Sequence, residues 1–242
     1  MEFSFTYEQQ AIRELAGKIF GDRVTHQRLL VIESGRDLID RELWRKLAEA
    51  SLLGTALPEQ HGGGGLGFFE FCMVLEEAGR VVAPIPLVPA VVLAALPIAE
   101  FGSDRQKERD LPRLCAGGAI LTAALVEVGS SDPARPRLTA TRDGSAWRLD
   151  GEKVCVPAGQ LAERILVPAS TGKETIGVFL LDPATSGVTL EAQQATNREP
   201  QARLTCSGAA VDGNDVLGDP DGGESIVRWI EDRAALGLSA LQ

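Results

Sequence analysis

Apolar residues recur at intervals of three and four through the N-terminal half of the chain, and this spacing predicts amphipathic helices. One helix follows Thr6 and Gln9, whose three-residue spacing is typical of a capping box, and it is expected to end near Gly21. A second is expected to start at Asp40 and to stop at Gly54. Their apolar faces are, in order, Ile12, Leu15, Ile19 and Phe20, and then Leu43, Trp44, Leu47 and Ala50.

A glycine-rich stretch at residues 57–67 comes next and leads into another helix. Glycines can cradle a phosphate, but no strand pattern precedes them and no Lys-Ser or Lys-Thr pair follows, so a P-loop is not expected. We interpret the stretch as a flexible loop. The helix after it is expected to end at Gly79, and its buried face consists of Phe68, Phe71, Cys72 and Leu75.

Two further N-terminal segments differ sharply in polarity. Residues 84–89 are rich in proline and lead into an apolar segment that ends at Gly102. Ser103 and Gln106 then have capping-box spacing ahead of a charged helix at residues 105–114. We interpret that charged helix as a solvated face.

From Ile120 onward the apolar pattern changes to a period of two, which is typical of β-strands. Asp143-Gly144 and Asp150-Gly151 are expected to form turns between strands. The alternating apolar positions are Leu138, Ala140, Trp147, Leu149, Val154 and Val156, and later strand-like runs cover residues 164–168, 175–181, 188–192 and 202–211. These features predict a compact β domain.

A last helical segment, residues 224–242, follows a linker at residues 219–223, and its pattern continues to the final residue, Gln242, without a stop signal. Its apolar face consists of Ile226, Ile230, Ala234, Leu238 and Leu241. The fold class is therefore predicted as α+β. We expect an all-α helical domain at residues 1–118, an antiparallel β-barrel or sandwich domain at 119–219, and the start of a truncated C-terminal helical domain at 220–242.

Composition and charge narrow the functional classes. With 242 residues, 44% hydrophobic and 24% charged, the chain has the composition of a soluble globular protein. Its formal charge of −10 argues against a nucleic-acid partner, because neutralising phosphates requires a basic face. The longest apolar stretch, residues 87–99, is too short for a membrane span and contains two prolines, and no secretory peptide is visible. We expect a cytoplasmic protein with no membrane partner.

Cysteine and histidine usage argues against several chemistries. The four cysteines are far apart and form no CxxC pair, so zinc is not expected and a reducing compartment is the simplest explanation. The two histidines, His26 and His61, offer little for a Ser-His-Asp or Cys-His centre, and we interpret each as an ordinary surface or loop residue. The cysteines are Cys72, Cys115, Cys155 and Cys206.

Two segments near the start of the β region resemble flavin-binding signatures. Residues 123–127, Ala-Ala-Leu-Val-Glu, are followed by Ser-Ser-Asp at residues 130–132 and resemble the first flavin signature of the acyl-CoA dehydrogenase family. Residues 151–157, Gly-Glu-Lys-Val-Cys-Val-Pro, resemble the second. The loop at 57–67 and the helix at 102–114 also resemble N-terminal motifs of this family. The four matches in this order are more specific together than any one of them alone.

The resemblance implies a flavin enzyme whose members hold FAD and an acyl-CoA thioester between two helical domains and a β domain. It places Val126, Glu127, Ser131, Cys155 and Pro157 at the cofactor site. Val126 and Pro157 stand where the family has threonine hydroxyls, Cys155 stands where it has a tryptophan, and Ser131 is the residue expected at the pyrophosphate. The site is therefore expected to be weakened. The alternative is that these are ordinary strand residues of a β domain that no longer holds flavin.

The resemblance also suggests a catalytic carboxylate in the last helix. One branch of the family, which includes isovaleryl- and long-chain-type enzymes, places its base on the first helix after the β domain, just before an arginine. In this chain that position falls on Asp232, with Arg233 beside it. Such a base must be buried within reach of the substrate, with its pKa raised toward the working pH. The alternative is that Asp232 and Glu231 are solvated acids in the N-terminal half of a helix.

These features together resemble the heteromeric branch of the family that oxidises sterol side-chain CoA thioesters. In that branch two unlike subunits pair, and one has lost its own flavin site. The resemblance implies that this chain is that partner in a heterotetramer, that a sister subunit holds most of the FAD, and that an electron-transfer flavoprotein accepts the electrons. The other interpretations are a non-catalytic structural subunit and a self-sufficient homotetrameric enzyme. This polypeptide alone is expected to have no turnover, because the C-terminal domain is missing from the sequence.

Overall fold

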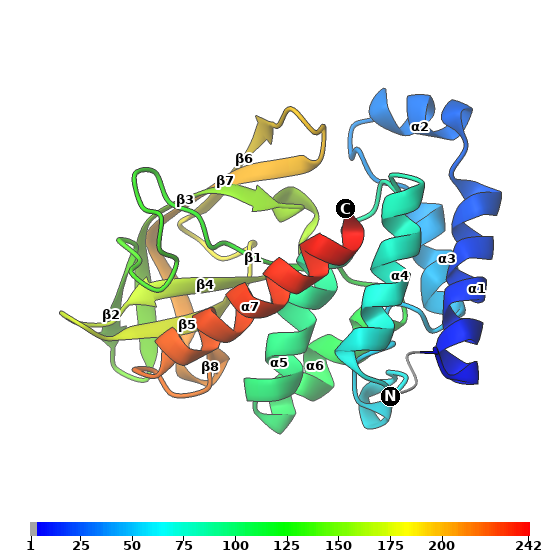
Figure 1. The fold of residues 1–242 in the computed structure, drawn as a ribbon. Coiled ribbons are helices and arrows are strands. Elements are labelled where there is room, and N and C mark those ends of the chain that lie inside the picture. Colours follow the sequence, from blue (N-terminus) through cyan, green and yellow to red (C-terminus); the bar gives the residue numbers. More distant parts are fainter. Residues whose placement is uncertain (1–3) are drawn as a thin grey trace.

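The N-terminal part of the chain forms a bundle of helices. The computed structural model describes residues 4–242. Figure 1 shows the helices on one side and the strands on the other, with the last helix, α7 (Gly223–Leu241), crossing between them. No helix in the described range is long and apolar enough to cross a bilayer. The bundle consists of α1 (Tyr7–Arg23), α2 (His26–Glu33), α3 (Arg41–Glu49), α4 (Phe68–Arg80), α5 (Leu96–Phe101) and α6 (Asp104–Cys115), with the 3-10 turn η1 (Glu59–His61) and the π-helical segment η2 (Val88–Ala95).

The predicted cap of the first helix is confirmed, but two predicted helix ends differ. The Gln9 N–H donates to the Thr6 hydroxyl and the Thr6 N–H donates to the Gln9 side chain, so α1 starts with a capping box. The helix then continues past Gly21. Helix α3 ends before Ser51, whose φ of 59° is left-handed, rather than at Gly54. A left-handed residue stops a helix wherever it occurs, and here it is not a glycine.

Helix α2 has no counterpart in the sequence prediction. Its apolar residues, 29–32, are consecutive and give no amphipathic period. The helix starts at Thr25, whose hydroxyl accepts the Arg28 N–H. The Arg28 side chain in turn binds the carboxylate of Asp40, the residue that caps α3. Caps and a side-chain contact, rather than a periodic face, therefore hold this helix.

The glycine-rich loop is ordered by hydrogen bonds rather than flexible, in contrast to the prediction. The N–H groups of residues 63–65 donate to carbonyls of residues 54–58 over distances of 2.8 to 3.1 Å. At Gly63 a side chain would begin 2.1 Å from the Leu57 carbonyl oxygen, so the position requires glycine. His61 lies in this loop, as predicted, but it is buried, because η1 packs against α6.

The charged helix α6 joins the bundle to the strands, so the prediction of a solvated face was wrong for part of it. Gln106 is buried, and its Nε2 donates to the carbonyls of Asn214 and Val216, both at 2.8 Å. Arg109 donates to Asp215 at 2.6 Å. The partners of these polar side chains lie far away in the sequence, where a local pattern cannot indicate them.

The strands form one eight-stranded, mostly antiparallel sheet after the helical region, as predicted. Their order is β6-β7-β3-β2-β4-β5-β8, and β1 pairs with β4 in parallel. The strands are β1 (Leu121–Ala123), β2 (Thr139–Asp143), β3 (Ala146–Pro157), β4 (Arg164–Ser170), β5 (Ile176–Leu181), β6 (Val188–Gln194), β7 (Pro200–Asp212) and β8 (Val216–Leu217), with short turns η3 (Gly159–Leu161) and η4 (Gly213–Asp215).

Strand β3 contains a feature that the sequence prediction assigned to a turn. Asp143-Gly144 does connect β2 to β3, with Gly144 at a φ of 62°. Asp150-Gly151 instead lies inside β3, at a point where the pairing with β7 shifts between Leu149 and Asp150. The shift is a β-bulge whose extra residue, Gly208, lies on β7, so β3 continues through Asp150-Gly151 without ending.

Helices and strands share one apolar core. The larger of two clusters of buried residues joins the helical bundle to Ile120, to Leu166 in β4 and to Val227 in α7. The smaller cluster fills the sheet around Trp147 and Phe179, whose ring centroids are 5.4 Å apart. The element type changes between α6 and β1 and again between β8 and α7, but the division into three separate domains stays a prediction.

Candidate functional site

The two segments that resemble flavin signatures lie side by side. Val126 and Val154 form an antiparallel bridge, in which the Val154 N–H donates to the Val126 carbonyl at 2.9 Å. Their neighbours Glu127 and Lys153 form an ion pair, in which Lys153 Nζ lies 2.6 Å from Glu127 Oε1. The resemblance requires that these two segments be neighbours, and the fold brings them together.

Glu127 is anchored inside the β region. The exposed fraction is 6% for Glu127 and 0% for Lys153. Besides Lys153, the carboxylate accepts the N–H groups of Arg137 and Leu138 at 2.7 and 3.1 Å. Burial alone would raise the pKa of Glu127, but Lys153 and the two N–H donors outweigh it and hold the pKa below its ordinary value. Glu127 therefore fixes the backbone of its segment, and it does not line the cavity that Val126 faces.

A cavity of about 510 Å³ lies between the helices and the strands. Three of the five residues expected at the cofactor site line it, namely Val126, Cys155 and Pro157. The other walls come from α2, from residues 82–89, from the turn between β6 and β7, and from the C-terminal half of α7. A mostly apolar cavity of this size, at a boundary between structural layers, is typical of a small-molecule site.

The side chains at the three motif positions carry no hydroxyl, and the Pro157 carbonyl and the Cys155 N–H are already used. Val126 is 46% exposed but has an apolar side chain. Pro157 lacks a backbone N–H, and its carbonyl accepts the Thr122 hydroxyl at 2.6 Å. The Cys155 N–H donates to Gln193 Oε1 at 2.7 Å. Because a protein holds and tunes a flavin ring through hydrogen bonds to its nitrogen and oxygen atoms, these three positions do not fit FAD.

Cys155 has an unusual backbone conformation at the cavity wall. Its φ of 52° is in the left-handed region, which residues other than glycine rarely adopt. It lies where the pairing of β3 with β7 shifts between Lys153 and Val156. Cys155 is exposed, whereas Val154 and Val156 on either side are buried. Alternation fails one step earlier, where Lys153 and Val154 are both buried, and Cys155 lines the cavity after this irregularity.

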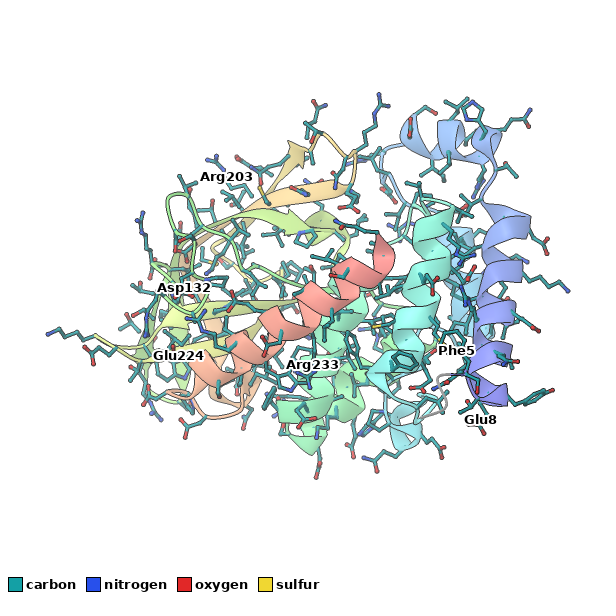
Figure 2. The ribbon with its side chains drawn as sticks, viewed as in Figure 1. Phe5, Glu8, Asp132, Arg203, Glu224 and Arg233 are labelled. Atoms are coloured by element: carbon teal, nitrogen blue, oxygen red, sulfur yellow. The ribbon has the colours of Figure 1, made fainter. Side chains whose placement is uncertain are left out.

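The loop of residues 129–132 is held against α7 rather than against the cavity. Asp132 binds Arg228 through both carboxylate oxygens, at 2.8 and 2.9 Å, and Arg228 holds the pKa of Asp132 below its ordinary value. Figure 2 shows Asp132 near the N-terminal end of α7, close to Glu224. Ser131 is exposed and does not line the cavity, so its contact with a pyrophosphate stays a prediction.

The expected base, Asp232, is not among the residues that face the cavity. Helix α7 lines the cavity with Ala234, Leu238 and Leu241, which recur at helical intervals. Asp232 precedes Ala234 by two residues, so it projects from the opposite side of the helix, and it is exposed. Its catalytic role stays a prediction, and its exposure favours the alternative of a solvated acid.

Arg233 packs on an aromatic pair instead of pointing into the cavity. Its guanidinium carbon lies 3.4 Å from the ring centroid of Trp229, and Trp229 meets Phe101 edge to face with centroids 5.4 Å apart. Figure 2 places Arg233 on the flank of α7 nearer to α5. The edge-to-face contact with Phe101 of α5 therefore joins α7 to the bundle, and the guanidinium stacks on Trp229 within α7 by a cation–π contact.

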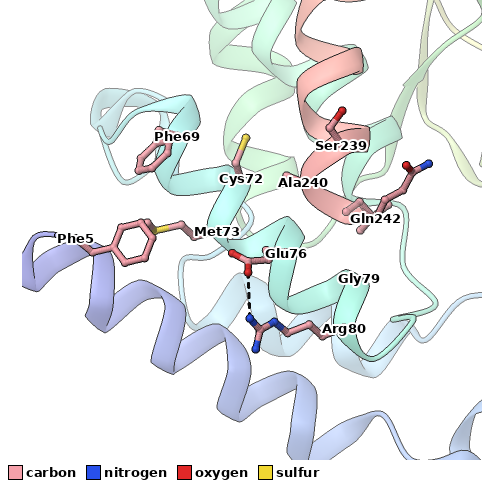
Figure 3. A pocket seen from close by; sticks show the side chains of 11 residues that line it. Phe5, Phe69, Cys72, Met73, Glu76, Gly79, Arg80, Ser239, Ala240 and Gln242 are labelled. Carbon is pink, nitrogen blue, oxygen red and sulfur yellow. Dashed lines mark hydrogen bonds and ion pairs between the residues drawn. The ribbon is translucent and has the colours of Figure 1, made fainter. Parts of the chain in front are cut away.

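A second cavity of about 530 Å³ lies between α4 and the end of α7, where the sequence prediction placed no site. Figure 3 shows Phe69, Cys72 and Met73 on α4 and Ser239 and Gln242 at the end of α7. Burial raises the pKa of the Cys72 thiol, which makes it a poorer nucleophile. The lining combines apolar side chains with a surface ion pair, so we assign this cavity no catalytic role.

Sequence reasoning missed three residues that organise the first cavity, Thr122, Lys153 and Gln193. Lys153 lies within the second motif, and its place in an apolar strand is a signal that a buried partner must exist. Thr122 lies in β1 and Gln193 lies in β6, and each bonds to the second motif from a strand that is distant in sequence. No local pattern could have indicated them.

Comparisons with known proteins agree with the fold and the paired motifs. The family model described as Acyl-CoA dehydrogenase, N-terminal domain, matches residues 6–118. Acyl-CoA dehydrogenase FadE27 of Mycobacterium tuberculosis is 32% identical over 242 residues, which is 100% of this chain and 62% of that protein. The chain thus spans less than two thirds of the length of this relative.

Two solved structures match nearly the whole chain. A variant of the Tcur3481–Tcur3483 steroid ACAD is 42% identical with a TM-score of 0.89, over 97% of this chain and 62% of that one. The ChsE4–ChsE5 complex from Mycobacterium tuberculosis is 31% identical with a TM-score of 0.91, over 100% of this chain and 64% of that one. The two motif segments pair beside a cavity, and both the sequence and the fold match those of these proteins. The chain therefore belongs to the acyl-CoA dehydrogenase family.

Proposed function

We propose that this chain is a subunit of a flavin-dependent acyl-CoA dehydrogenase and that it is the partner with the weakened flavin site in a heteromer. The whole assembly would convert an acyl-CoA thioester into a trans-2-enoyl-CoA. The observation that carries the proposal is the cavity wall at Val126, Cys155 and Pro157, whose side chains offer no hydroxyl or amide group. A flavin placed there would lose contacts worth on the order of 1 kcal/mol each.

α,β-Dehydrogenation needs two groups that the predicted site residues do not supply. A base must reach the Cα proton, and preorganised donors must polarise the thioester carbonyl. Asp232 is exposed on the far side of α7, and the motif positions present no side-chain hydroxyl or amide group. We therefore assign the FAD site and the base to a sister subunit. The present chain contributes an apolar wall, and an electron-transfer flavoprotein accepts the electrons from the assembly.

The likeness to two-subunit assemblies supports the heteromeric part of the proposal. One similar structure is a complex of two named subunits, ChsE4 and ChsE5, and another is named a steroid ACAD. By analogy with these, the acyl group handled by the present assembly is a sterol-derived side chain. Mostly apolar walls on the cavity of about 510 Å³ are compatible with such a group.

Flavin stoichiometry tests the weakened site. The chain is purified alone and after co-expression with candidate sister subunits, and flavin absorbance is compared with protein content. We expect a colourless chain alone and a yellow complex. The double variant Val126→Thr with Pro157→Thr restores donors and is expected to increase flavin binding, whereas Val128→Thr, at an exposed position outside the cavity, is the control. One flavin per chain in the unmodified protein alone would contradict the proposal.

A second candidate function is a purely structural subunit, and the exposure of Asp232 favours it. The two candidates differ in the effect of Val126→Phe, which narrows the cavity, within a purified, flavin-containing complex. A slower rate of enoyl-CoA formation with unchanged flavin content would show that this wall contacts the acyl group, as the first candidate requires. An unchanged rate would leave this chain with a structural role only.

A further inference from the structure

The outer wall of the cavity is closed by two surface elements from distant parts of the chain. Helix α2 contributes Leu29, Ile32 and Glu33, and the turn between β6 and β7 contributes residues 197–199. Figure 1 shows the β6–β7 hairpin reaching toward α2. Within the described range, an ion pair joins the two elements, with Arg198 Nη1 at 3.0 Å from Glu33 Oε2.

Helix α2 is held firmly at one end and weakly at the other. Within residues 26–33, all of which the structure describes, no residue is buried. In the first turn, Arg28 donates to both carboxylate oxygens of Asp40 at 2.7 and 2.8 Å, and Asp40 is 1% exposed. At the last residue, Glu33 is bound to Arg198 across the cavity. The helix thus has a fixed first turn and a releasable end.

The β6–β7 turn holds Arg198 in a defined place. Arg198 has a φ of 60°, and its N–H donates to the Ala195 carbonyl at 3.0 Å. Asn197 and Glu199 bond to each other twice, at 2.8 and 3.2 Å. These local contacts keep the turn compact. The backbone that carries Arg198 is therefore held by the turn, whereas no residue of α2 is buried.

We propose that α2 is a gate on this cavity and that the Glu33–Arg198 ion pair is its latch. Opening breaks this exposed pair and moves Leu29 and Ile32 away from the cavity wall, while the contact between Arg28 and the α3 cap acts as the pivot. Exposed ion pairs are weak and are screened by salt, so the gate opens readily and closes again. The closed state excludes bulky molecules, and small solutes pass in either state. The gate is independent of which subunit holds FAD.

Cys155 provides a reporter, because it is exposed and lines the cavity behind the gate. In a Cys72→Ser background, the rate at which a bulky polyethylene-glycol maleimide alkylates Cys155 is compared with the rate for iodoacetamide. The ratio of the bulky-reagent rate to the small-reagent rate reports how often α2 opens. Cys115 and Cys206 react slowly with both reagents, since they are buried and burial raises the pKa of each to about 11.

Removing the Glu33–Arg198 ion pair should raise the rate at which the bulky maleimide alkylates Cys155 more than the rate with iodoacetamide. Glu33→Gln is expected to raise the bulky-to-small rate ratio about 1.5- to 5-fold, the range that an exposed ion pair allows. Raising sodium chloride to about 0.5 M should do the same in the parent protein and have little effect in the variant. The charge exchange of Glu33→Arg with Arg198→Glu should return the ratio to its starting value.

Asp143→Asn is the matched control, because it removes a comparably exposed ion pair with Arg148, at 2.9 Å, in the β2–β3 hairpin. It should leave the ratio unchanged. The gate is overturned if Glu33→Gln leaves the ratio unchanged, or if Asp143→Asn raises it equally. A rise in both reagent rates together would indicate general loosening and would also count against a gate.

Discussion

Replacing Lys153 tests how the buried ion pair holds the first motif segment. Lys153→Met keeps a long side chain but removes the ammonium, which leaves the Glu127 carboxylate in a site that is 6% exposed. The Arg137 and Leu138 N–H groups remain as its partners. Removing one member of a buried pair costs about 3–5 kcal/mol, because the other charge is left uncompensated. Against a total free energy of unfolding of about 5–15 kcal/mol, the variant should fold with much of its stability lost.

The pH dependence of this loss gives a sharper signature than its size. In the native protein the pKa of Glu127 is held below its ordinary value, although burial opposes this, by Lys153 and two N–H donors. The stability from these contacts is present above the unfolded-state pKa and is lost as pH falls through the lower folded-state pKa. In Lys153→Met, burial dominates and the folded-state pKa rises, so the carboxyl takes up a proton on mild acidification. The deficit should be largest near neutral pH and shrink toward about pH 4.

Urea unfolding followed by tryptophan fluorescence, at neutral pH and at about pH 4.5, measures both effects. Glu152→Gln is the control, because Glu152 is exposed on the same strand and its ion pair with Arg203 spans 4.0 Å. That variant should change the free energy of unfolding by less than about 0.5 kcal/mol. A deficit in Lys153→Met below about 1 kcal/mol, or one that does not vary with pH, would refute the reasoning.

Three other substitutions test separate contacts. Gly63→Ala should lower the free energy of unfolding in urea by about 1–3 kcal/mol, because its new Cβ begins 2.1 Å from a backbone carbonyl oxygen. Asp40→Ala should cost about 2 kcal/mol at neutral pH and less in acid, since the wild-type carboxyl has its pKa held low, despite burial, by a guanidinium and two N–H donors. Arg228→Ala should speed hydrogen exchange at residues 129–132, measured by mass spectrometry, because Asp132 loses its bidentate partner.

Local rules predicted the features whose partners are close in sequence. The capping boxes at Thr6 and Ser103 and the turn at Gly144 depend on residues within three positions of one another. The period of two after Ile120 predicted β3 and β7, because these strands bury alternate residues along most of their length. Motif resemblance, rather than periodicity, indicated that the segments at residues 126–127 and 153–155 meet.

Features that depend on distant partners could not be predicted in this way. The burial of Gln106 depends on carbonyls at residues 214 and 216, and α2 depends on an ion pair to Asp40. Asp150-Gly151 has the composition of a turn, and only its pairing with β7 shows that β3 continues through it. At the candidate site, Glu127 was expected beside a cofactor, but a buried ammonium draws its carboxylate into the sheet.

One buried apolar cluster contains residues of the bundle, Leu166 of β4 and Val227 of α7. Each part of the chain therefore needs the others to bury its apolar side chains. A cut between Gly118 and Ala119 would leave complementary apolar surfaces on the two pieces. Each piece alone should aggregate, because large exposed apolar patches drive association. Produced together, the pieces should find each other and rebuild the fold. The chain is thus suited to fragment complementation, with recovery of soluble protein as its readout.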